Sequence, residues 1–551
     1  MKTITLTFPS GERISVPSGT RAITLLNHFS EPKEHIFAVM VNNETTPLDQ
    51  PLSFTAHVEP IIDASKEGAA VYRRSLCLLL GAAAHTVFPG SRLLVGHSLG
   101  HGYYYTLDTG VQMNSEDITA LEAEMRQLVA KDVPIETDSI SYEEALTLFE
   151  TTGVRDARKQ LNYFCPPFVR INTIDAFSDM YFGPLVPSTG YLKTFEIKQY
   201  GEGFLLRFPN TSQPHQLTEF RDQPKLFAVY QRYKDWGKRL GVTSAADLNE
   251  LVANRTIDDF ITITETLQEK TIADIADQIA ARNNVRVVLI AGPSSSGKTT
   301  TSKKLALELR AIGYTPKIIS LDSYYVGRER NPKDENGNYD YECLEALDIE
   351  FLNQSLLDLF NGKEIAVPSY NFTSGTRYFE DKHKMQLHEH DILIMEGIHG
   401  LNDKLTPLID TDLKFKVYIS ALTQLNLDDH NRIATSDNRL IRRIVRDSRF
   451  RGKSAAATIS MWPSVQRGEQ LHIFPFQNNA DAILNTALDY EIAVLKVYAD
   501  PLLRCVSPLC KEYSEACRLL NFLGNFSPIA STEVPDRSII REFIGGSAFE
   551  Y

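Results

Sequence analysis

The stretch VRVVLIAGPSSSGKTT, residues 285–300, joins an apolar strand to a loop rich in glycine and serine and then to a helix start. It matches the phosphate-loop pattern G-x-x-x-x-G-K-[ST] in the expected strand–loop–helix context. Glycines let backbone N–H groups wrap phosphates without Cβ clashes, and the helix N-terminus adds partial positive charge. Lys298 is expected to reach the β- and γ-phosphates, and the Thr299 hydroxyl to ligate Mg²⁺. The predicted nucleotide-binding residues are Gly292, Pro293, Ser294, Ser295, Ser296, Gly297, Lys298, Thr299 and Thr300.

Two acidic side chains follow further predicted strands. The strand Asp391–Met395 ends at Glu396, and the strand Pro316–Leu321 ends at Asp322. In a parallel sheet the carboxyl ends of the strands form the ligand-binding edge. We therefore interpret Glu396 as a ligand of Mg²⁺ or of a metal-bound water, and Asp322 as the base that takes the proton of an attacking hydroxyl. The structural alternatives are a helix-capping carboxylate and a turn aspartate.

Positive charge gathers in the segment Asn438–Lys453 of an otherwise acidic chain. Arginines three and four residues apart share a helix face, and a planar guanidinium suits phosphate oxygens and transition-state charge. We expect this segment to be a lid over ATP from which Arg443 and Arg446 act in catalysis. A solvated basic helix or an RNA-contact patch remains the alternative. The basic residues are Arg439, Arg442, Arg443, Arg446, Arg449, Arg451 and Lys453.

A chain of 551 residues is too long for one ordinary core, so several domains are expected. After Asn284, short apolar strands alternate with helices, which indicates a parallel α/β sheet. The fold class is therefore α/β: a β-grasp domain, an α+β domain with a helix over Ser115–Lys131, a helical connector, the phosphate-loop domain and a helical extension. Their predicted ranges are 1–62, 68–235, 243–282, 285–485 and 487–551.

Composition and termini indicate a cytoplasmic protein. Hydrophobic residues make up 43% and charged residues 23%, as in ordinary soluble proteins. The net charge of −13 argues against a nonspecific nucleic-acid binder. Six cysteines at irregular spacing are typical of reduced thiols. The first residues lack the apolar core of a signal peptide, and the longest apolar run, Leu76–Ala84, is too short to span a bilayer.

From about Val285 to Asn485 the chain resembles the uridine kinase/phosphoribulokinase family. By that likeness Asp322 would be the base for a ribose 5′-hydroxyl, and Asp340, Tyr370, Arg377 and Tyr325 would bind a nucleoside. The segments that carry the likeness are Gly292–Thr299, Leu321–Tyr325, Tyr339-Asp340 with Ala346–Asp348, Pro368–Phe372, Thr376-Arg377, Met395–Ile398 and Arg442–Asp447.

One position departs from that family in a way that bears on the acceptor. Uridine-cytidine kinases carry a histidine after the tyrosine segment that reads the pyrimidine, and Gly375 stands there in this chain. A side chain that hydrogen-bonds a base edge supplies much of the discrimination between bases. The resemblance therefore implies a nucleoside kinase and leaves the base open.

The N-terminal half carries a second resemblance. Residues 1–62 look like a TGS domain, and Phe88–Gly90 and Asp179–Gly190 lie in a region, 68–235, similar to the editing region of threonyl-tRNA synthetase. The histidines and cysteine of that hydrolytic site correspond to Leu78, Ala82, Tyr181 and Leu185, none of which can bind a metal or activate water as the originals could. We interpret this half as a scaffold that has lost editing chemistry; weak RNA binding, ligand sensing and a homo-oligomer surface are the roles left open.

Three functions follow from these patterns. The first is a Mg²⁺- and ATP-dependent kinase that phosphorylates the 5′-hydroxyl of a nucleoside. The second keeps the kinase chemistry and changes the acceptor to a sugar phosphate or another small alcohol, which the glycine at position 375 favours. The third is an RNA-binding or regulatory protein whose phosphate loop acts as a nucleotide switch.

Overall fold

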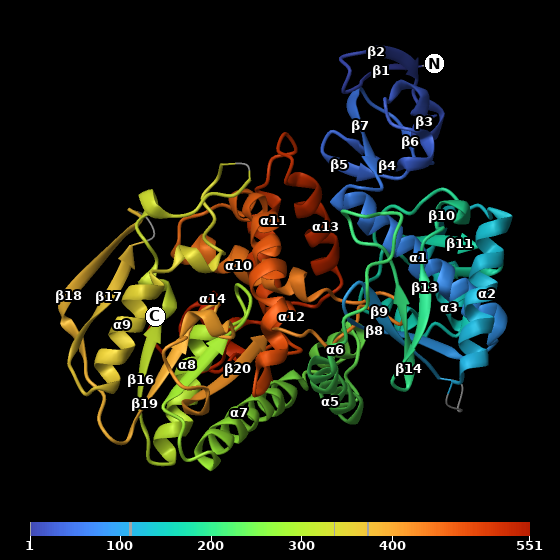
Figure 1. The fold of residues 1–551 in the computed structure, drawn as a ribbon. Coiled ribbons are helices and arrows are strands. Elements are labelled where there is room, and N and C mark those ends of the chain that lie inside the picture. The colour runs from blue at the N-terminus through green and yellow to red at the C-terminus, as the bar shows by residue number, and fades with distance from the viewer. Residues whose placement is uncertain (1, 109–112, 336, 372–373, 551) are drawn as a thin grey trace. The chain divides into compact units, whose positions relative to one another are not determined.

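The computed structural model describes residues 2–108, 113–335, 337–371 and 374–550, and its chain forms two units (Figure 1). The N-terminal unit comprises Met1–Arg255, Gln424–Ile433 and Asp500–Pro528, and the C-terminal unit comprises Thr256–Thr423, Ala434–Ala499 and Ile529–Tyr551. Each unit therefore contains segments from more than one part of the chain. Within the described residues, no helix is both long enough and apolar enough to cross a membrane.

A five-stranded parallel sheet forms the centre of the C-terminal unit, with strand order β16-β19-β15-β20-β21. The parallel α/β architecture expected for this part of the chain is confirmed. The strand that precedes the phosphate loop, β15, lies in the middle of the sheet. The strands are β15 (Val287–Ala291), β16 (Thr315–Ser320), β19 (Asp391–Glu396), β20 (Lys414–Ser420) and β21 (Ala482–Asn485).

Both faces of this sheet are covered, which explains why its strands read as continuous apolar runs. Alternate residues of β15 point to opposite faces: Val288 packs in the cluster of α7 (Ile257–Ala281) and α8 (Lys298–Ala311), and Leu289 packs with α9 (Ile349–Phe360). The remaining elements of the unit include the hairpin β17 (Ile365–Asn371) and β18 (Thr376–Met385) and the helices α10 (Thr435–Phe450), α11 (Ala455–His472), α12 (Glu491–Arg504) and α14 (Arg541–Ile544).

The first strands of the N-terminal unit form a mixed five-stranded sheet, in which β1 and β7 are parallel. After the hairpin of β1 and β2, residues Ala22–His28 form a 3-10 helix. The strand order is β2-β1-β7-β4-β5, with β1 (Thr3–Thr7), β2 (Arg13–Pro17), β4 (Ile36–Val41), β5 (Glu44–Thr46) and β7 (Ala56–Ile62).

The rest of the N-terminal unit packs helices on antiparallel sheets. One sheet has the order β13-β14-β9-β8 and another the order β10-β11-β12. The predicted helix Ser115–Lys131 is α2, and Asn114 and Asp117 form a capping box at its start. The strands are β8 (Arg92–Ser98), β9 (Gly102–Asp108), β10 (Glu136–Ser141), β11 (Phe168–Ile174), β12 (Phe177–Asp179), β13 (Glu196–Tyr200) and β14 (Gly203–Arg207). The helices are α1 (Lys66–Val87), α2, α3 (Tyr142–Thr152), α4 (Arg155–Gln160), α5 (Pro224–Leu240), α6 (Ala245–Ala253) and α13 (Tyr513–Gly524).

The four positions that correspond to the synthetase's editing residues meet in one apolar core. Leu78 and Ala82 lie one turn apart on α1 and pack in the same cluster as Tyr181 and Leu185. The exposed fractions of the four residues are 0%, 4%, 4% and 5%, so all four side chains are buried.

A ten-residue segment, Gln424–Ile433, belongs to the N-terminal unit although the parallel sheet surrounds it in sequence. Its backbone pairs with β8, where the Val95 N–H donates to the Asp429 carbonyl at 2.9 Å. His430 Nδ1 lies 2.7 Å from the Asp179 carboxylate, and both side chains are buried. These polar contacts anchor the segment in the editing-like region.

Candidate active site

The phosphate loop follows β15, and close packing explains its glycines. A Cβ at Gly292 would lie 2.2 Å from the Ile419 carbonyl oxygen, so no larger residue fits. Gly297 adopts φ +86°, the left-handed region that glycine enters without strain, and begins α8. The loop is thus shaped by its neighbours to present backbone N–H groups at a helix N-terminus, which is an anion-binding arrangement.

The side chain of Lys298 contacts the backbone of the phosphate loop. Its ammonium donates to the carbonyl oxygens of Gly292 at 3.0 Å and Pro293 at 3.2 Å. The next residue, Thr299, directs its hydroxyl toward the Glu396 carboxylate, with Oγ1 and Oε1 3.5 Å apart. The structure therefore brings the lysine, the threonine and the strand-end glutamate together.

Asp322 and Glu396 belong to neighbouring strand ends. The register pairs Ser320 of β16 with Glu396 of β19, and Asp322 follows two residues later in a 3-10 turn. Burial, reinforced by the negative charge of Asp322, raises the pKa of Glu396 to about 7. Burial also raises the pKa of Asp322, against the opposing charges of Lys298, Arg451 and Arg446. Two acidic groups in a poorly hydrated site favour a bound cation or a shared proton.

A carboxylate from the chain's C-terminal region also contacts the phosphate loop. Glu542 of α14 accepts hydrogen bonds from the Thr300 backbone N–H at 3.2 Å and from its hydroxyl at 2.7 Å. The methyl group Cγ2 of Ile539 lies 2.7 Å from where a Cβ at Gly297 would stand. Glu542 thus accepts from the backbone N–H and the hydroxyl of Thr300, the two groups that Thr300 would offer to a phosphate.

Two of the predicted lid arginines are buried in ion pairs. Arg439 pairs with Glu469 and donates to the Ser294 carbonyl at 3.1 Å. Arg442 pairs with Glu491 and donates to the Ser295 carbonyl at 3.2 Å. Both side chains therefore brace the backbone of the phosphate loop.

The next two arginines of α10 lie toward the loop and Asp322. Arg443 Nη1 donates to the Ser294 hydroxyl at 2.8 Å, and Arg446 Nη2 lies 3.0 Å from the Asp447 carboxylate. Arg451 lies 3.6 Å from the same carboxylate. The buried Asp447 therefore pairs with all three arginines, and the charges of Arg446 and Arg451 act on Asp322.

The residues expected to bind the acceptor cluster around one aromatic wall. The rings of Tyr325 and Tyr370 are 5.6 Å apart, and the Tyr325 hydroxyl donates to the Tyr341 carbonyl at 3.0 Å. Asp340 lies beside this wall, where its Oδ1 accepts from the Glu342 N–H at 2.9 Å. The expected motif residue Phe372 lies outside the described residues.

Arg377 contacts the protein itself. Its guanidinium donates to Asp348 Oδ2 at 3.1 Å and to the carbonyls of Tyr324 and Tyr325 at 3.2 and 3.1 Å. These contacts hold the turn that carries Asp322.

Gly375 occupies a position that a histidine could not take without strain. Its φ is +71°, and a Cβ there would lie 2.9 Å from the Arg328 Cβ. The Arg328 N–H donates to the Gly375 carbonyl at 2.9 Å, which fixes this close approach. The local backbone therefore disfavours a histidine at this position.

Four acidic residues near this site were not singled out from the sequence: Glu342, Glu469, Glu491 and Glu542. Burial raises the pKa of Glu342 to about 7, and the charges of Lys298 and Asp322 act on it. Only Glu342 had a local signal, because it lies two residues after Asp340. The others lie in distant segments of the chain: Glu469 contacts Ser294, Glu542 contacts Thr300, and Glu491 pairs with Arg442.

Known proteins similar to the C-terminal unit are kinases. The family model described as Phosphoribulokinase / Uridine kinase family matches residues 287–493. A uridine kinase of Macrococcus caseolyticus is 31% identical over 210 residues, covering 38% of this chain and 91% of that kinase. A uridine kinase of Staphylococcus epidermidis is 28% identical over 214 residues, covering 38% of this chain and 93% of that kinase.

The N-terminal region is similar to part of a synthetase. A threonine–tRNA ligase of Carboxydothermus hydrogenoformans is 32% identical over 198 residues, covering 35% of this chain and 31% of the ligase. The chain thus matches about a third of the ligase's length, and this similarity includes the TGS and editing segments.

Proposed function

The chain belongs to the phosphoribulokinase/uridine kinase family, and on this premise we propose that it transfers the γ-phosphate of ATP to the 5′-hydroxyl of a nucleoside. One observation carries the proposal: Lys298, Thr299, Asp322 and Glu396 converge at the carboxyl edge of the parallel sheet. A phosphate cradle, a metal-ligand pair and a candidate base at one edge are the parts that phosphoryl transfer requires.

The residues at this edge fit a magnesium ion. The Thr299 hydroxyl and the Glu396 carboxylate are oxygen donors 3.5 Å apart, and Mg²⁺ is bound through one or two such groups and the phosphates. When bound, Mg²⁺ supplies neutralisation of phosphate charge. Glu396 favours a cation for a second reason, because burial and Asp322 disfavour its own unpaired negative charge.

Asp322 supports proton transfer from the acceptor. Its burial raises its pKa, which makes its carboxylate a stronger base than an exposed aspartate. Lys298, Arg451 and Arg446 oppose that rise in pKa, because their positive charges favour the carboxylate form. Arg443 beside Ser294 and Arg446 beside Asp447 are oriented to stabilise charge on the transferred group.

The acceptor pocket is proposed to be the aromatic wall of Tyr325 and Tyr370 with Asp340. Stacked or tilted rings suit a planar base, and a carboxylate suits the vicinal hydroxyls of a ribose. Arg377 contributes by holding the turn of Asp322 through the carbonyls of Tyr324 and Tyr325.

Nucleotide binding requires a rearrangement at Thr300. A phosphate that uses the Thr300 N–H has to displace the Glu542 carboxylate, which accepts from the same group at 3.2 Å. The ammonium of Lys298 likewise has to exchange the loop carbonyls for phosphate oxygens. Both exchanges replace contacts within the protein by contacts with the nucleotide.

A second candidate acceptor is a sugar phosphate or another small alcohol. The observation that favours it is Gly375, because its φ of +71° and its close approach to Arg328 disfavour a base-reading side chain at this position. The phosphoryl-transfer residues would be the same for either acceptor.

The test is incubation of the full-length protein with Mg-ATP and separate panels of nucleosides and of sugar phosphates. Release of ADP together with a nucleoside monophosphate supports the proposal. A product from the sugar phosphates alone would select the second candidate. Absence of any ADP above that of the Lys298→Ala variant would contradict both.

A further inference from the structure

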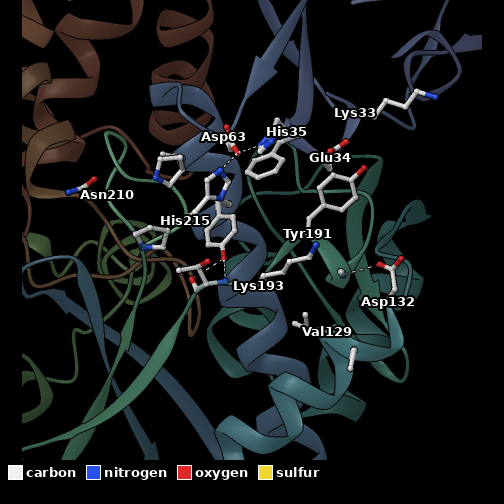
Figure 2. Close-up of a pocket in the computed structure, with 18 residues that line it drawn as sticks. Lys33, Glu34, His35, Asp63, Val129, Asp132, Tyr191, Lys193, Asn210 and His215 are labelled. Atoms are coloured by element: carbon white, nitrogen blue, oxygen red, sulfur yellow. Dashed lines mark hydrogen bonds and ion pairs between the residues drawn. The ribbon is translucent and has the colours of Figure 1, made fainter. Parts of the chain in front are cut away.

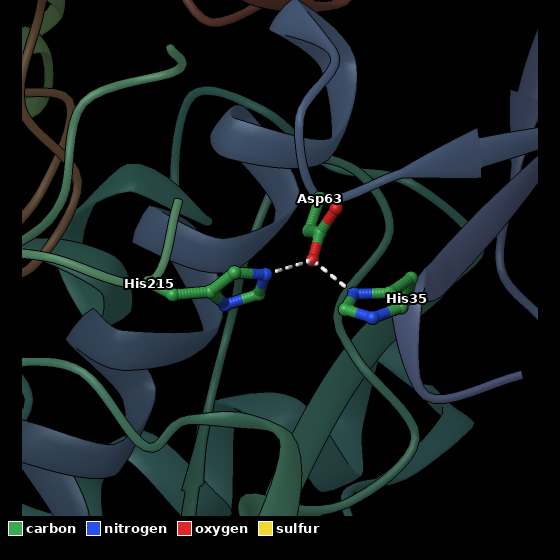
Figure 3. Close-up of side chains that lie close together, drawn as sticks. All are labelled: His35, Asp63 and His215. Atoms are coloured by element: carbon green, nitrogen blue, oxygen red, sulfur yellow. Dashed lines mark hydrogen bonds and ion pairs between the residues drawn. The ribbon is translucent and has the colours of Figure 1, made fainter. Parts of the chain in front are cut away.

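Three side chains from separate segments of the N-terminal unit converge on one another (Figure 3). Oδ2 of Asp63 lies 2.6 Å from Nδ1 of His35 and 3.2 Å from Nε2 of His215. One donor atom from each residue can be chosen so that all three lie within 4.8 Å of one another. None of these residues takes part in the proposed phosphoryl transfer.

The fold explains why two of the three donors are adjacent. The register of β4 and β7 pairs Ile36 with Ile62, so the residue before one strand and the residue after the other lie side by side. The Asp63 N–H donates to the His35 carbonyl at 3.0 Å, which fixes this junction. His215 approaches from the segment between β14 and α5.

We propose that His35, Asp63 and His215 bind a divalent transition-metal ion, with Zn²⁺ as the preferred ion. Two imidazole nitrogens and one carboxylate oxygen form a donor set typical of zinc, whereas Mg²⁺ and Ca²⁺ favour oxygen donors. Zinc ligands in a tetrahedral site are about 3.3 Å apart, so His35 would retreat from Asp63 by roughly 0.7 Å.

The carboxylate is already oriented for such a role. Asp63 is buried, and its second oxygen, Oδ1, accepts from the Ala64 N–H at 2.7 Å. That contact directs Oδ2 toward both histidines. Groups that hold a ligand in place in this way are a regular part of metal sites.

The site lies in the wall of a cavity of about 880 Å³ (Figure 2). His35, Asp63 and His215 all line it, together with Tyr72, Tyr191 and Lys193. Three protein ligands leave one position of a four-coordinate ion open, and zinc sites of that kind exchange a water for a ligand. The positive charge of the ion would favour a water or a small anion in this position.

The competing account is a hydrogen-bonded cluster without an ion. Two neutral imidazoles can each donate an N–H to Asp63, and this arrangement would also hold the His215 segment in place. The two accounts differ in metal stoichiometry and in the response to removal of one histidine.

The experiment is titration of full-length, chelator-treated protein with Zn²⁺, and in parallel with Mg²⁺ and Co²⁺. His215→Ala is the main variant because this side chain is 63% exposed and its loss leaves the core intact. His35→Gln is the second variant. His57→Ala, an exposed histidine on β7, is the matched control.

We expect one Zn²⁺ per chain and no comparable Mg²⁺ binding. His215→Ala should weaken Zn²⁺ by more than about 100-fold, since loss of a group that only orients a ligand costs about 10–100-fold. His57→Ala should bind as the wild type does. Co²⁺ should give visible absorption without the thiolate charge-transfer band that the free cysteines would produce.

Either of two results would overturn the proposal: no stoichiometric Zn²⁺ binding by the wild type, or binding that His215→Ala and His35→Gln leave unchanged. The first would leave the hydrogen-bonded cluster only. Phosphorylation activity should be the same in the wild type and His215→Ala, so this test is independent of the proposed kinase function.

Discussion

The phosphate-loop edge and the editing-like core each resemble a catalytic site of a known family. Their side chains differ in polarity. At the first, Lys298, Asp322 and Glu396 are polar groups held close together, with two carboxyl pKa values raised by burial. At the second, Leu78 and Tyr181 fill an apolar core. Polar groups suited to catalysis are therefore held together in only one of the two regions.

The two regions also differ in what burial contributes to the stability of the protein. Burial of Asp322 and Glu396 is unfavourable unless a cation or a proton compensates it, so such groups are typical of functional sites. Burial of Leu78 and its neighbours stabilises the fold without any ligand. A substitution should accordingly change turnover in one region and stability in the other.

The largest effect is expected from Asp322→Asn. Removal of a general base should lower kcat by roughly 10²–10⁴ while the Kd for ATP changes little. Steady-state phosphorylation assays and ATP titration measure the two quantities. Asp412→Asn, an exposed aspartate just before the first residue of β20, serves as the control. Unchanged turnover in Asp322→Asn would show that Asp322 is not the general base.

The next effect concerns stability in the editing-like core. Leu78→Ala should lower the free energy of unfolding of the N-terminal unit by about 2–5 kcal/mol, because it leaves a cavity at a fully buried position. Urea unfolding followed by circular dichroism measures this change, and kcat should stay at the wild-type value. Leu509→Ala is the matched control, since that leucine is 90% exposed. A lower kcat with an unchanged free energy of unfolding would contradict this assignment of Leu78 to the core.

A smaller effect is expected from Glu542→Gln. Neutralising the group that accepts from Thr300 should tighten Mg-ATP binding by roughly fivefold, because a charged acceptor adds about 1 kcal/mol over a neutral one. Calorimetric titration gives the Kd. Glu533→Gln, an exposed glutamate nearby in sequence, should bind ATP as the wild type does. Weaker ATP binding in Glu542→Gln would mean that this carboxylate assists the nucleotide.

The smallest effect is a dependence of Mg²⁺ affinity on pH. The pKa of Glu396 is raised to about 7, so its carboxylate form prevails above that pH and its neutral form below it. Since only the carboxylate binds the ion, Mg²⁺ affinity should fall about twofold from pH 8 to pH 7 and more steeply below. Mg²⁺ titration of the initial rate measures it. Glu396→Gln should bind Mg²⁺ weakly at every pH, and a flat profile in the wild type would reassign Glu396.

The sequence was most informative where function depends on neighbours in the chain. The loop from Gly292 to Thr299 and the strand-end residues Asp322 and Glu396 were identifiable because each follows an apolar strand, and parallel strands end at one edge. The parallel sheet and the α2 bounds were predictable from hydrophobic periodicity and capping residues for the same local reason.

The features that could not be predicted from the sequence depend on contacts between residues far apart in the chain. Glu542 is 242 residues from Thr300, and nothing around it in the sequence marks it as a partner of the loop. Arg439 was expected in the lid. In the structure it forms a buried ion pair with Glu469 of α11, which lies 30 residues further along the chain. His35, Asp63 and His215 likewise share no motif, and only the β4–β7 register and the later loop bring them together.

One preparation of the full-length protein, assayed for two reactions, tests the central claim most directly. The first reaction is phosphorylation of nucleosides by Mg-ATP, and the second is hydrolysis of an aminoacyl-tRNA ester. The account predicts ADP and a nucleoside 5′-monophosphate in equal amounts, with ester hydrolysis at the uncatalysed rate. Catalysed ester hydrolysis, or ATP use with no phosphorylated acceptor, would contradict it.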